Sequence, residues 1–256
     1  MTPSLILIRH GEVEPAWKSI CYGAMDVPLS EFGIQESIRV ADQVCREFQP
    51  RLVIHSGLRR TEFLASEISK RCLADCGVIE DVRLRERNYG EWQGKTWDEV
   101  YASDPEHFHD LIGKPETYRP PHGETTNELQ RRMAAWLEQI AATSRDGIRA
   151  PIIAITHSGP IAAACGQLLN LHAMDWSPWT IRCLQAVFVD QLCGARPSQC
   201  SLSSFQTAPA GERSWADKKC RTVVPNRSAE GHGPKSKRIF PTDKNCEVSH
   251  RAFPND

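Results

Sequence analysis

The sequence lacks the long apolar runs and the cysteine spacing that mark membrane proteins and zinc proteins. No stretch reaches the roughly 18 apolar residues that a membrane helix needs, and the N-terminal run LILI is too short for a secretory signal. The ten cysteines are scattered between Cys21 and Cys246 without a CxxC pair, which gives no zinc framework. We therefore expect reduced thiols, no metal ion and a soluble cytoplasmic protein.

The chain also has almost no net charge. Its 31 basic and 32 acidic residues leave a formal charge of -1, so we expect neither a nucleic acid nor a membrane surface as the partner, and a small molecule instead. A length of 256 residues exceeds the roughly 100–200 that are typical of one domain. We predict one catalytic domain over residues 1–228, a polar and disordered tail over residues 229–256, and a monomer or homodimer that needs no cofactor.

Three apolar runs of strand length alternate with helical patterns. The runs are LILI (Leu5–Ile8), RLVIH (Arg51–His55) and PIIAI (Pro151–Ile155). Behind the capping residue Ser30, apolar residues recur every three or four positions as far as Phe48, which is typical of an amphipathic helix. Strands that alternate with helices predict an α/β fold, a three-layer α/β/α sandwich with a mostly parallel central sheet.

Further elements are indicated by weaker patterns. Helical stretches run from the second strand to about Ala74 and from Pro160 to about Leu171, and a capping box of Thr125 and Glu128 opens another. Three weaker strand candidates follow from composition: Val78–Val82, and, as an antiparallel edge pair, Ser201–Gln206 and Cys220–Val224.

Residues from about 86 to 121 interrupt this alternation. The segment is aromatic and rich in glycine and proline, without clear periodicity, so we predict a lid insertion rather than part of the sheet. Its Tyr89, Trp92 and Trp97 either pack the lid or stack on a flat ligand, and packing is the commoner role. Three histidines in or beside it are candidates to line the entrance to a site or to bind a metal ion, although a solvated loop is the commoner setting: His107, His109 and His122.

Polar residues follow the apolar runs where chemistry is expected. The carboxyl ends of parallel strands share one edge of a sheet, so residues just after the three runs should face a common pocket. Those residues are Arg9, His10, Arg60 and His157. Two arginines repel a metal cation but suit a phosphate, because each guanidinium presents a planar fork of donors worth about 1.5–3 kcal/mol for each well-aligned bond. The sequence therefore predicts a phosphate site.

A histidine in this setting is a candidate nucleophile. The arginines penalise a second positive charge nearby, so His10 should stay neutral and attack phosphorus, forming a phosphohistidine. The arginines and His157 would hold the charge on the equatorial oxygens. Glu86, at the start of the lid, is the candidate proton donor to the leaving group and later the base that activates water. Two alternatives stay open. Glu86 could instead be a solvated ion-pair partner of Arg85 or Arg87, or Glu91 could be the proton donor in its place.

Five sequence blocks resemble the histidine phosphatase superfamily, also called phosphoglycerate mutase-like. In order they are LIRHGEVE, SGLRRTEFLA, LRERNYGEWQG, HGET and THSGPI, and they cover residues 5 to about 171. The resemblance implies that His10 is the phosphorylated histidine and that the spacing within the second block selects Arg60 rather than Arg59. The remaining residues implied by position are Arg9 as the second phosphate-clamping arginine, His157 as the second histidine, Glu86 as the proton donor, and Gly11, Tyr22 and Ser158 as further substrate contacts.

Within the superfamily, the block CYGAMDVPLSEFG (residues 21–33) is most similar to the α-ribazole phosphatase branch of cobalamin biosynthesis. Ala16 stands where many members have asparagine, and Thr125 replaces the commoner serine. The resemblance implies a phosphatase that hydrolyses a small phosphorylated metabolite. The alternatives are a phosphoglycerate mutase-type phosphotransferase and a relative that binds a phosphate-containing ligand without turnover.

Overall fold

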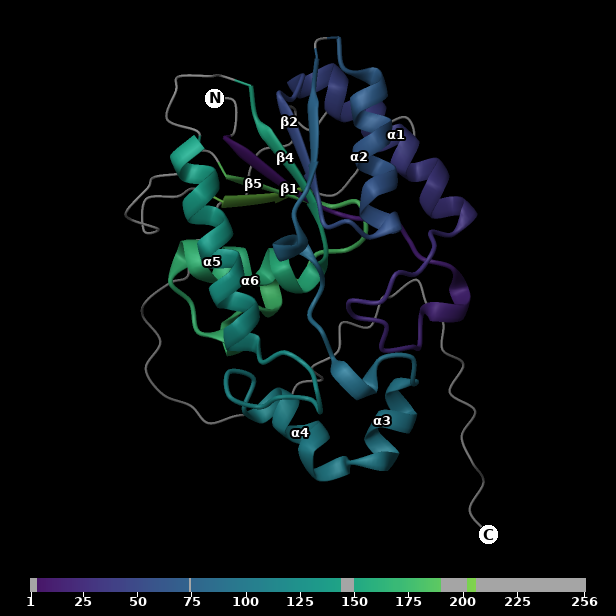
Figure 1. Ribbon diagram of the computed structural model, residues 1–256, viewed down its shortest axis with the longest axis vertical. Coiled ribbons are helices and arrows are strands. Elements are labelled where there is room, and N and C mark those ends of the chain that lie inside the picture. The colour runs from purple at the N-terminus through teal and green to yellow at the C-terminus, as the bar shows by residue number, and fades with distance from the viewer. Residues whose placement is uncertain (1–3, 74, 144–149, 190–201, 206–256) are drawn as a thin grey trace. The chain divides into compact units, whose positions relative to one another are not determined.

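The computed structural model describes residues 4–73, 75–143, 150–189 and 202–205 (Figure 1). The strand predicted at Cys220–Val224, the boundary predicted after residue 228 and the predicted tail over residues 229–256 lie outside the described residues.

Within the described residues, six strands form one sheet in the order β3-β2-β4-β1-β5-β6. The neighbours β1 and β4, β4 and β2, and β2 and β3 are parallel, whereas β5 is antiparallel to β1 and β6 is antiparallel to β5. The predicted mostly parallel sheet is therefore confirmed. The strands are β1 (Leu5–Arg9), β2 (Leu52–His55), β3 (Gly77–Glu80), β4 (Ile152–Thr156), β5 (Ala186–Val189) and β6 (Leu202–Phe205).

Helices cover both faces of the sheet, and three of the α-helices lie in the chain between β3 and β4 (Figure 1). The α-helices in the described part are α1 (Glu31–Phe48), α2 (Arg59–Arg71), α3 (Trp97–Ser103), α4 (Pro105–Gly113), α5 (Thr126–Thr143) and α6 (Ser158–Leu169). Short 3-10 helices lie at Pro15–Trp17, Val82–Leu84, Gly90–Trp92, Ala173–Asp175 and Ser177–Trp179.

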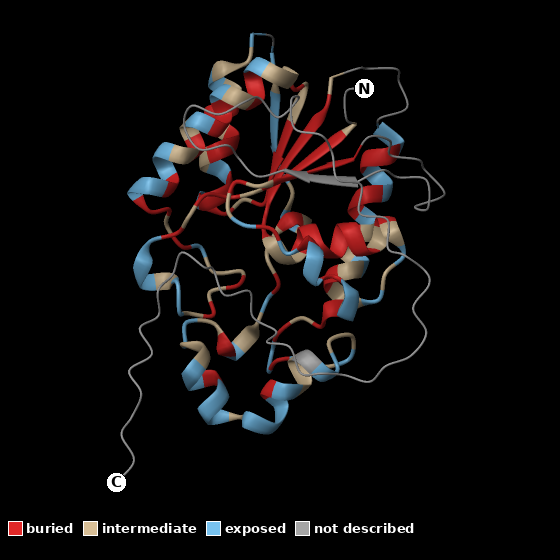
Figure 2. Cartoon of the chain, turned by 180° about the vertical axis from the view of Figure 1, so that it is seen from behind, coloured by how far each residue is buried: buried red, intermediate tan, exposed pale blue. Residues whose placement is uncertain are grey.

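The side chains of β1 divide the core into two layers. Leu5 and Leu7 pack with α5 and α6 on one face of the sheet. Ile6 and Ile8 pack with α1 and α2 on the other face. All four are fully buried, and Figure 2 shows the central strands as the buried interior between the helices. Because strand side chains alternate between faces, this pattern requires helices on both sides, and the predicted three-layer sandwich is confirmed.

The predicted helix starts are confirmed by their caps. The Ser30 hydroxyl accepts a hydrogen bond from the Gly33 backbone amide at 2.9 Å and opens α1. At α5, the Thr125 hydroxyl accepts from the Glu128 amide at 3.1 Å, and the Glu128 carboxylate accepts from the Thr125 amide at 2.9 Å. Threonine thus performs the capping role that serine would have at this position.

The strand at β5 was missed by the sequence analysis. It is a four-residue apolar run, AVFV, that follows two short 3-10 helices rather than a long helix. The edge strand predicted at Ser201–Gln206 is confirmed as β6, although in the described residues its partner is β5.

The segment over residues 86–121 contains two helices that the sequence analysis did not predict. A capping box of Thr96 and Glu99 opens α3, and Asp104 caps α4 in front of Pro105, so both starts had a readable signal. The aromatic residues here pack on one another in a small core separate from the sheet, and the Tyr89 and Trp97 ring centroids are 5.6 Å apart.

Packing is therefore the role that the geometry favours for these aromatic residues, since Trp92 is only 2 % exposed. The histidines of this region lie at the surface. His107 Nδ1 is 2.8 Å from a carboxylate oxygen of Asp104, the cap of α4, and His122 Nε2 is 3.3 Å from Glu91.

Candidate active site

Two histidines meet where β1 and β4 end. The strands are parallel neighbours with Arg9 opposite Thr156, so the residues that follow, His10 and His157, lie side by side. Their ring centroids are 4.9 Å apart with the ring planes at 62°. The sheet register thus brings together side chains that are far apart in the sequence.

The ring of His10 has a defined tautomer. Its Nδ1 lies 2.6 Å from the Gly11 carbonyl oxygen, and a carbonyl can only accept, so Nδ1 carries the proton and Nε2 keeps its lone pair. Glycine is required at position 11 because a Cβ there would lie 2.7 Å from the Gly33 carbonyl oxygen. Gly11 therefore orients the histidine through its backbone.

Both histidines are held in the neutral form. Burial lowers the pKa of His10 and of His157 well below the usual value, and the charge of Arg60 lowers both further. The sequence predicts this effect from the charge of the arginines, but burial is the larger cause. His10 is 2 % exposed and His157 is fully buried. A neutral His10 is available as a nucleophile at neutral pH.

Arg60 is fully buried at the start of α2. It donates from Nη1 to the Met25 carbonyl at 2.6 Å, from Nη2 to the Gly23 carbonyl at 2.7 Å, and from Nε to His157 Nδ1 at 3.3 Å. These contacts with described residues use three of the five N–H groups of a guanidinium. Two remain that could reach a phosphoryl oxygen.

Arg59, its neighbour, faces the surface. Its side chain is 62 % exposed and pairs with Asp26, with Nε 2.8 Å from the carboxylate. The structure thus separates the two arginines by burial, with Arg60 inside and Arg59 at the surface.

A chain of hydrogen bonds fixes the tautomer of His157. Thr61 donates its hydroxyl to the Leu58 carbonyl at 2.8 Å, and the Ser56 hydroxyl lies 2.8 Å from Thr61 Oγ1 and 2.9 Å from His157 Nε2. If each hydroxyl donates once, His157 Nε2 donates to Ser56, and Nδ1 is the acceptor for Arg60. A contact from Nδ1 to a phosphoryl oxygen would require a proton on that atom.

Arg9 adds a second positive charge near His10, and the neutral Tyr22 lies beside Arg60. Arg9 donates from Nη1 to the Ile181 carbonyl at 2.7 Å, whereas its buried Nε has no hydrogen-bond partner in the described part of the chain. Tyr22 lies with its ring centroid 5.3 Å from Cζ of Arg60. Burial raises the pKa of Tyr22, so its hydroxyl stays protonated and can donate.

Glu86 lies at the N-terminus of α6, close enough to Arg9 and Arg60 to interact with their charges. Its Oε2 is 3.4 Å from the Ser158 hydroxyl and 3.3 Å from the Gly159 amide at the start of α6, and its Oε1 accepts from the Arg87 amide at 2.9 Å. Glycine leaves the room for this carboxylate, because a Cβ at position 159 would lie 2.2 Å from Glu86 Oε1.

The geometry favours Glu86 over the alternatives weighed for it. The side chain of Glu91 is 59 % exposed and faces His122. The neighbouring arginines have other partners: Arg85 Nε donates to the Ser56 carbonyl at 3.1 Å, and Arg87 Nε donates to the Glu124 carbonyl at 2.9 Å.

Two features of the site were missed by the sequence analysis. Ser56 directly follows the second apolar run, and that position at a strand end was the signal that could have identified it. Arg132, which contacts the backbone of Glu86, lies within α5, and nothing in the helical pattern marks it.

Neither a metal site nor a membrane span is found in the described residues. No group of three or more His, Cys, Asp or Glu side chains there is arranged to hold a metal ion. In the same residues, no helix combines the length and the apolar character that crossing a membrane requires.

Comparisons with known proteins identify two similar phosphatases by sequence. The chain is 30% identical over 177 residues to glucosyl-3-phosphoglycerate phosphatase of Mycolicibacterium vanbaalenii, covering 67% of this chain and 76% of that protein. It is 31% identical over 176 residues to metal-independent phosphoserine phosphatase of Arabidopsis thaliana, covering 65% and 72%. Both names agree with the predicted phosphatase type.

Solved structures show the same fold. The native structure of a mycobacterial glucosyl-3-phosphoglycerate phosphatase matches with a TM-score of 0.68 at 25% identity, covering 80% of this chain and 97% of that one. A candidate alpha-ribazole-5'-phosphate phosphatase of Escherichia coli matches with a TM-score of 0.66 at 19% identity, covering 79% and 95%, which supports the fold alone. The family model described as histidine phosphatase superfamily (branch 1) matches residues 5–190. The chain belongs to this superfamily, as the sequence blocks predicted.

Proposed function

We propose that the protein hydrolyses a small phosphomonoester and that His10 carries the phosphoryl group between two chemical steps. The observation that carries this proposal is the tautomer of His10. Its Nδ1 lies 2.6 Å from the Gly11 carbonyl oxygen and donates to it, so Nε2 has a free lone pair, on a ring that lies beside His157. Burial and the arginines keep that lone pair unprotonated.

Binding of the phosphate is supported by the donors around this lone pair. Arg60 retains two N–H groups beyond its contacts with described residues, and Arg9 has a buried Nε without a partner in the same residues. The N-terminus of α6 lies at the same place, and the amides of a helix N-terminus favour an anion. Gly11, Tyr22 and Ser158 are proposed as further contacts.

In the first step, Nε2 of His10 attacks phosphorus while the bond to the leaving oxygen breaks. Glu86 donates its proton to that oxygen, so an alcohol departs and a phosphohistidine remains. Arg9, Arg60 and His157 stabilise the charge on the equatorial oxygens. His157 takes part as a donor if the negative charge of the bound phosphate favours protonation of Nδ1 by solvent, in which case Nδ1 turns from Arg60 to a phosphoryl oxygen.

In the second step, the carboxylate of Glu86 takes a proton from a water molecule that attacks the phosphohistidine. The P–N bond breaks, inorganic phosphate leaves, and neutral His10 and protonated Glu86 are restored. The carboxylate is held 3.3 Å from the amide of Gly159, which lies two residues after His157 at the start of α6, and this position supports its use in both steps.

The substrate is proposed by class, as a phosphorylated metabolite with an alkyl leaving group. The similar phosphatases act, by their names, on glucosyl-3-phosphoglycerate and phosphoserine. α-Ribazole 5'-phosphate, suggested by residues 21–33, stays a prediction. A substrate panel should therefore contain these three compounds together with phosphoglycerates and sugar phosphates.

The test measures inorganic phosphate and organic product in the same reaction. A phosphatase releases inorganic phosphate in step with substrate loss, and His10→Ala should abolish this release. Isomerised substrate without phosphate release would indicate a mutase instead. Binding of the panel without turnover by the native protein would contradict the proposal and indicate a non-catalytic relative.

A further inference from the structure

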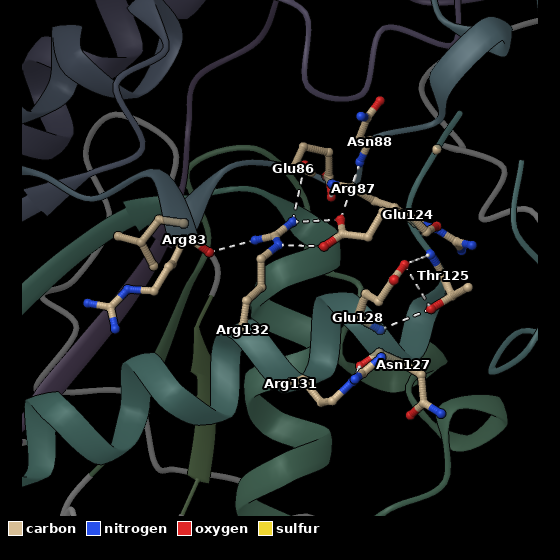
Figure 3. Close-up of polar contacts among 12 residues, drawn as sticks. Arg83, Glu86, Arg87, Asn88, Glu124, Thr125, Asn127, Glu128, Arg131 and Arg132 are labelled. Atoms are coloured by element: carbon tan, nitrogen blue, oxygen red, sulfur yellow. Dashed lines mark hydrogen bonds and ion pairs between the residues drawn. The ribbon is translucent and has the colours of Figure 1, made fainter. Parts of the chain in front are cut away.

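A partly buried arginine on α5, Arg132, binds the backbone that carries Glu86. Figure 3 shows Arg132 lying between the Glu124 carboxylate and the segment over residues 83–88. Arg132 donates from Nη1 to the Arg83 carbonyl at 2.5 Å and from Nη2 to the Glu86 carbonyl at 3.3 Å. One guanidinium thus binds two carbonyls of the segment, one of them belonging to Glu86 itself.

The same guanidinium forms a two-bond pair with Glu124. The Nε lies 2.7 Å from Oε1 and Nη2 lies 3.0 Å from Oε2. Only 20% of the Arg132 side chain and 16% of the Glu124 side chain are exposed, so solvent screens the pair less than a surface ion pair. A bidentate guanidinium–carboxylate pair also fixes the plane of the guanidinium, and with it the direction of the donors toward the carbonyls.

Glu124 holds the far end of the segment. Its backbone amide donates to the Asn88 carbonyl at 2.7 Å, its Oε2 accepts from the Asn88 amide at 3.4 Å, and its carbonyl accepts from Arg87 Nε at 2.9 Å. The pair of Arg132 and Glu124 therefore fixes backbone groups on both sides of Glu86.

The carboxylate of Glu86 depends on this support. Its contacts with α6 are long, 3.4 Å to the Ser158 hydroxyl and 3.3 Å to the Gly159 amide. Hydrogen bonds of this length lie at the upper end of the usual range and are weak. A displaced backbone at Glu86 would move the carboxylate, and a misplacement of about 1 Å can cost roughly 10²-fold in rate.

We propose that Arg132, held by Glu124, is a positioning residue that places the Glu86 carboxylate for proton transfer to the leaving group. The inference rests on the proposed function, because it assumes that Glu86 is the proton donor. It adds a residue of α5 that contacts no substrate and acts through the backbone of the donor.

The charge of Arg132 has a second effect that the test must separate. Burial is the main reason that the pKa of His157 is lowered, and the positive charge of Arg132 is one of the smaller causes. Arg132→Lys keeps that charge but replaces the planar fork with a single ammonium, which cannot bind both carbonyls and the carboxylate in the same way. If positioning is what matters, lysine should rescue little of the loss seen in Arg132→Ala.

The test compares two substrates that differ in their need for a proton donor. An alkyl phosphate has a poor leaving group and needs the proton, whereas a dinitrophenyl phosphate has a good leaving group and does not. The kcat/KM value is the correct measure because it reports the steps up to departure of the leaving group. The ratio of the two kcat/KM values is also unaffected by the fraction of enzyme that is folded.

We expect Arg132→Ala, Arg132→Lys and Glu124→Gln to lower kcat/KM for the alkyl phosphate about ten- to a hundredfold, with little change for the dinitrophenyl ester. Arg131→Ala is the matched control. Arg131 precedes Arg132 on α5, its exposed side chain points toward Asn127 in Figure 3, and its Nε contacts the Asn127 carbonyl at 3.4 Å. Both substrates should be unchanged in this variant.

Glu86→Gln separates this inference from the proposed function. If Glu86→Gln loses the alkyl substrate selectively while the Arg132 and Glu124 variants lose both substrates equally, the positioning role is wrong and the proposed function stands. If Glu86→Gln shows no selectivity, the proton-donor role itself fails and the positioning role fails with it. Should Arg132→Ala fail to fold, the more conservative Arg132→Lys decides the result.

Discussion

Replacement of Arg60 should remove most of the phosphate clamp, whereas replacement of its neighbour Arg59 should not. Arg60 is fully buried, and its contacts with described residues leave two N–H groups for phosphoryl oxygens. Charge-assisted bonds contribute about 1.5–3 kcal/mol each. Two such bonds amount to about 3–6 kcal/mol, or roughly a hundred- to ten-thousandfold in kcat/KM.

Arg59→Ala is the control. The Arg59 side chain is 62 % exposed and its ion pair with Asp26 is at the surface, where such pairs contribute roughly 0–1 kcal/mol to stability. We expect its kcat/KM for an aryl phosphate to stay within about threefold of the native value. The two variants change the same residue type at adjacent positions, so the comparison isolates the effect of location.

The assay must also separate lost catalysis from lost folding. Arg60 binds the carbonyls of Gly23 and Met25, so Arg60→Ala leaves buried acceptors without a donor and should lower the free energy of unfolding by about 1–3 kcal/mol. Rates are therefore normalised to folded enzyme, measured by circular dichroism. Equal losses in Arg59→Ala and Arg60→Ala would refute the assignment of the buried arginine as the clamp.

Three further predictions concern stability and the proton donor. Burial lowers the pKa of both His10 and His157 in the folded protein, so below about pH 6.5 the unfolded chain takes up protons that the folded chain does not, and the free energy of unfolding should fall on acidification by on the order of 1 kcal/mol per pH unit for each ring. A urea midpoint that does not change between pH 7 and 5 would contradict this, and a variant lacking both rings is the control. Gly159→Ala should displace Glu86, whose Oε1 lies 2.2 Å from the new Cβ, and should lower kcat for an alkyl phosphate by about a hundredfold with near-native stability; unchanged kcat would show that the carboxylate position is unimportant. Thr125→Ala should cost about 1 kcal/mol in urea unfolding by removing the cap of α5, whereas Thr125→Ser should cost little.

The sheet, and the proximity of His10 to His157 at its edge, could be predicted because they follow from one rule. Apolar runs such as LILI end at a common edge, and the parallel pairing of β1 and β4 places His10 beside His157. The resemblance to the superfamily selected Arg60 rather than Arg59, and its role in the site stays a prediction; in the structure Arg60 is fully buried. Local sequence patterns were sufficient to predict which residues lie together wherever the end of a strand alone determines where a residue lies.

The remaining features depend on tertiary contacts that a local pattern does not contain. β5 is only four residues long, AVFV, and became recognisable as a strand through its antiparallel pairing with β1. Arg132 has no periodic signal, since its partners are two carbonyls of residues 83–88 and the Glu124 carboxylate rather than residues of its own helix. The tautomer of His10 is assigned from the contact between its Nδ1 and the Gly11 carbonyl, and that contact can be seen only in the three-dimensional structure.

The central claim, that Nε2 of His10 carries the phosphoryl group, is tested most directly by trapping the intermediate. Native enzyme is mixed with a substrate that carries a radiolabelled phosphoryl group, quenched in alkali within one turnover and digested for peptide mapping. The account predicts an alkali-stable, acid-labile label on His10. Turnover with no label on any residue, or with the label on His157, would contradict it.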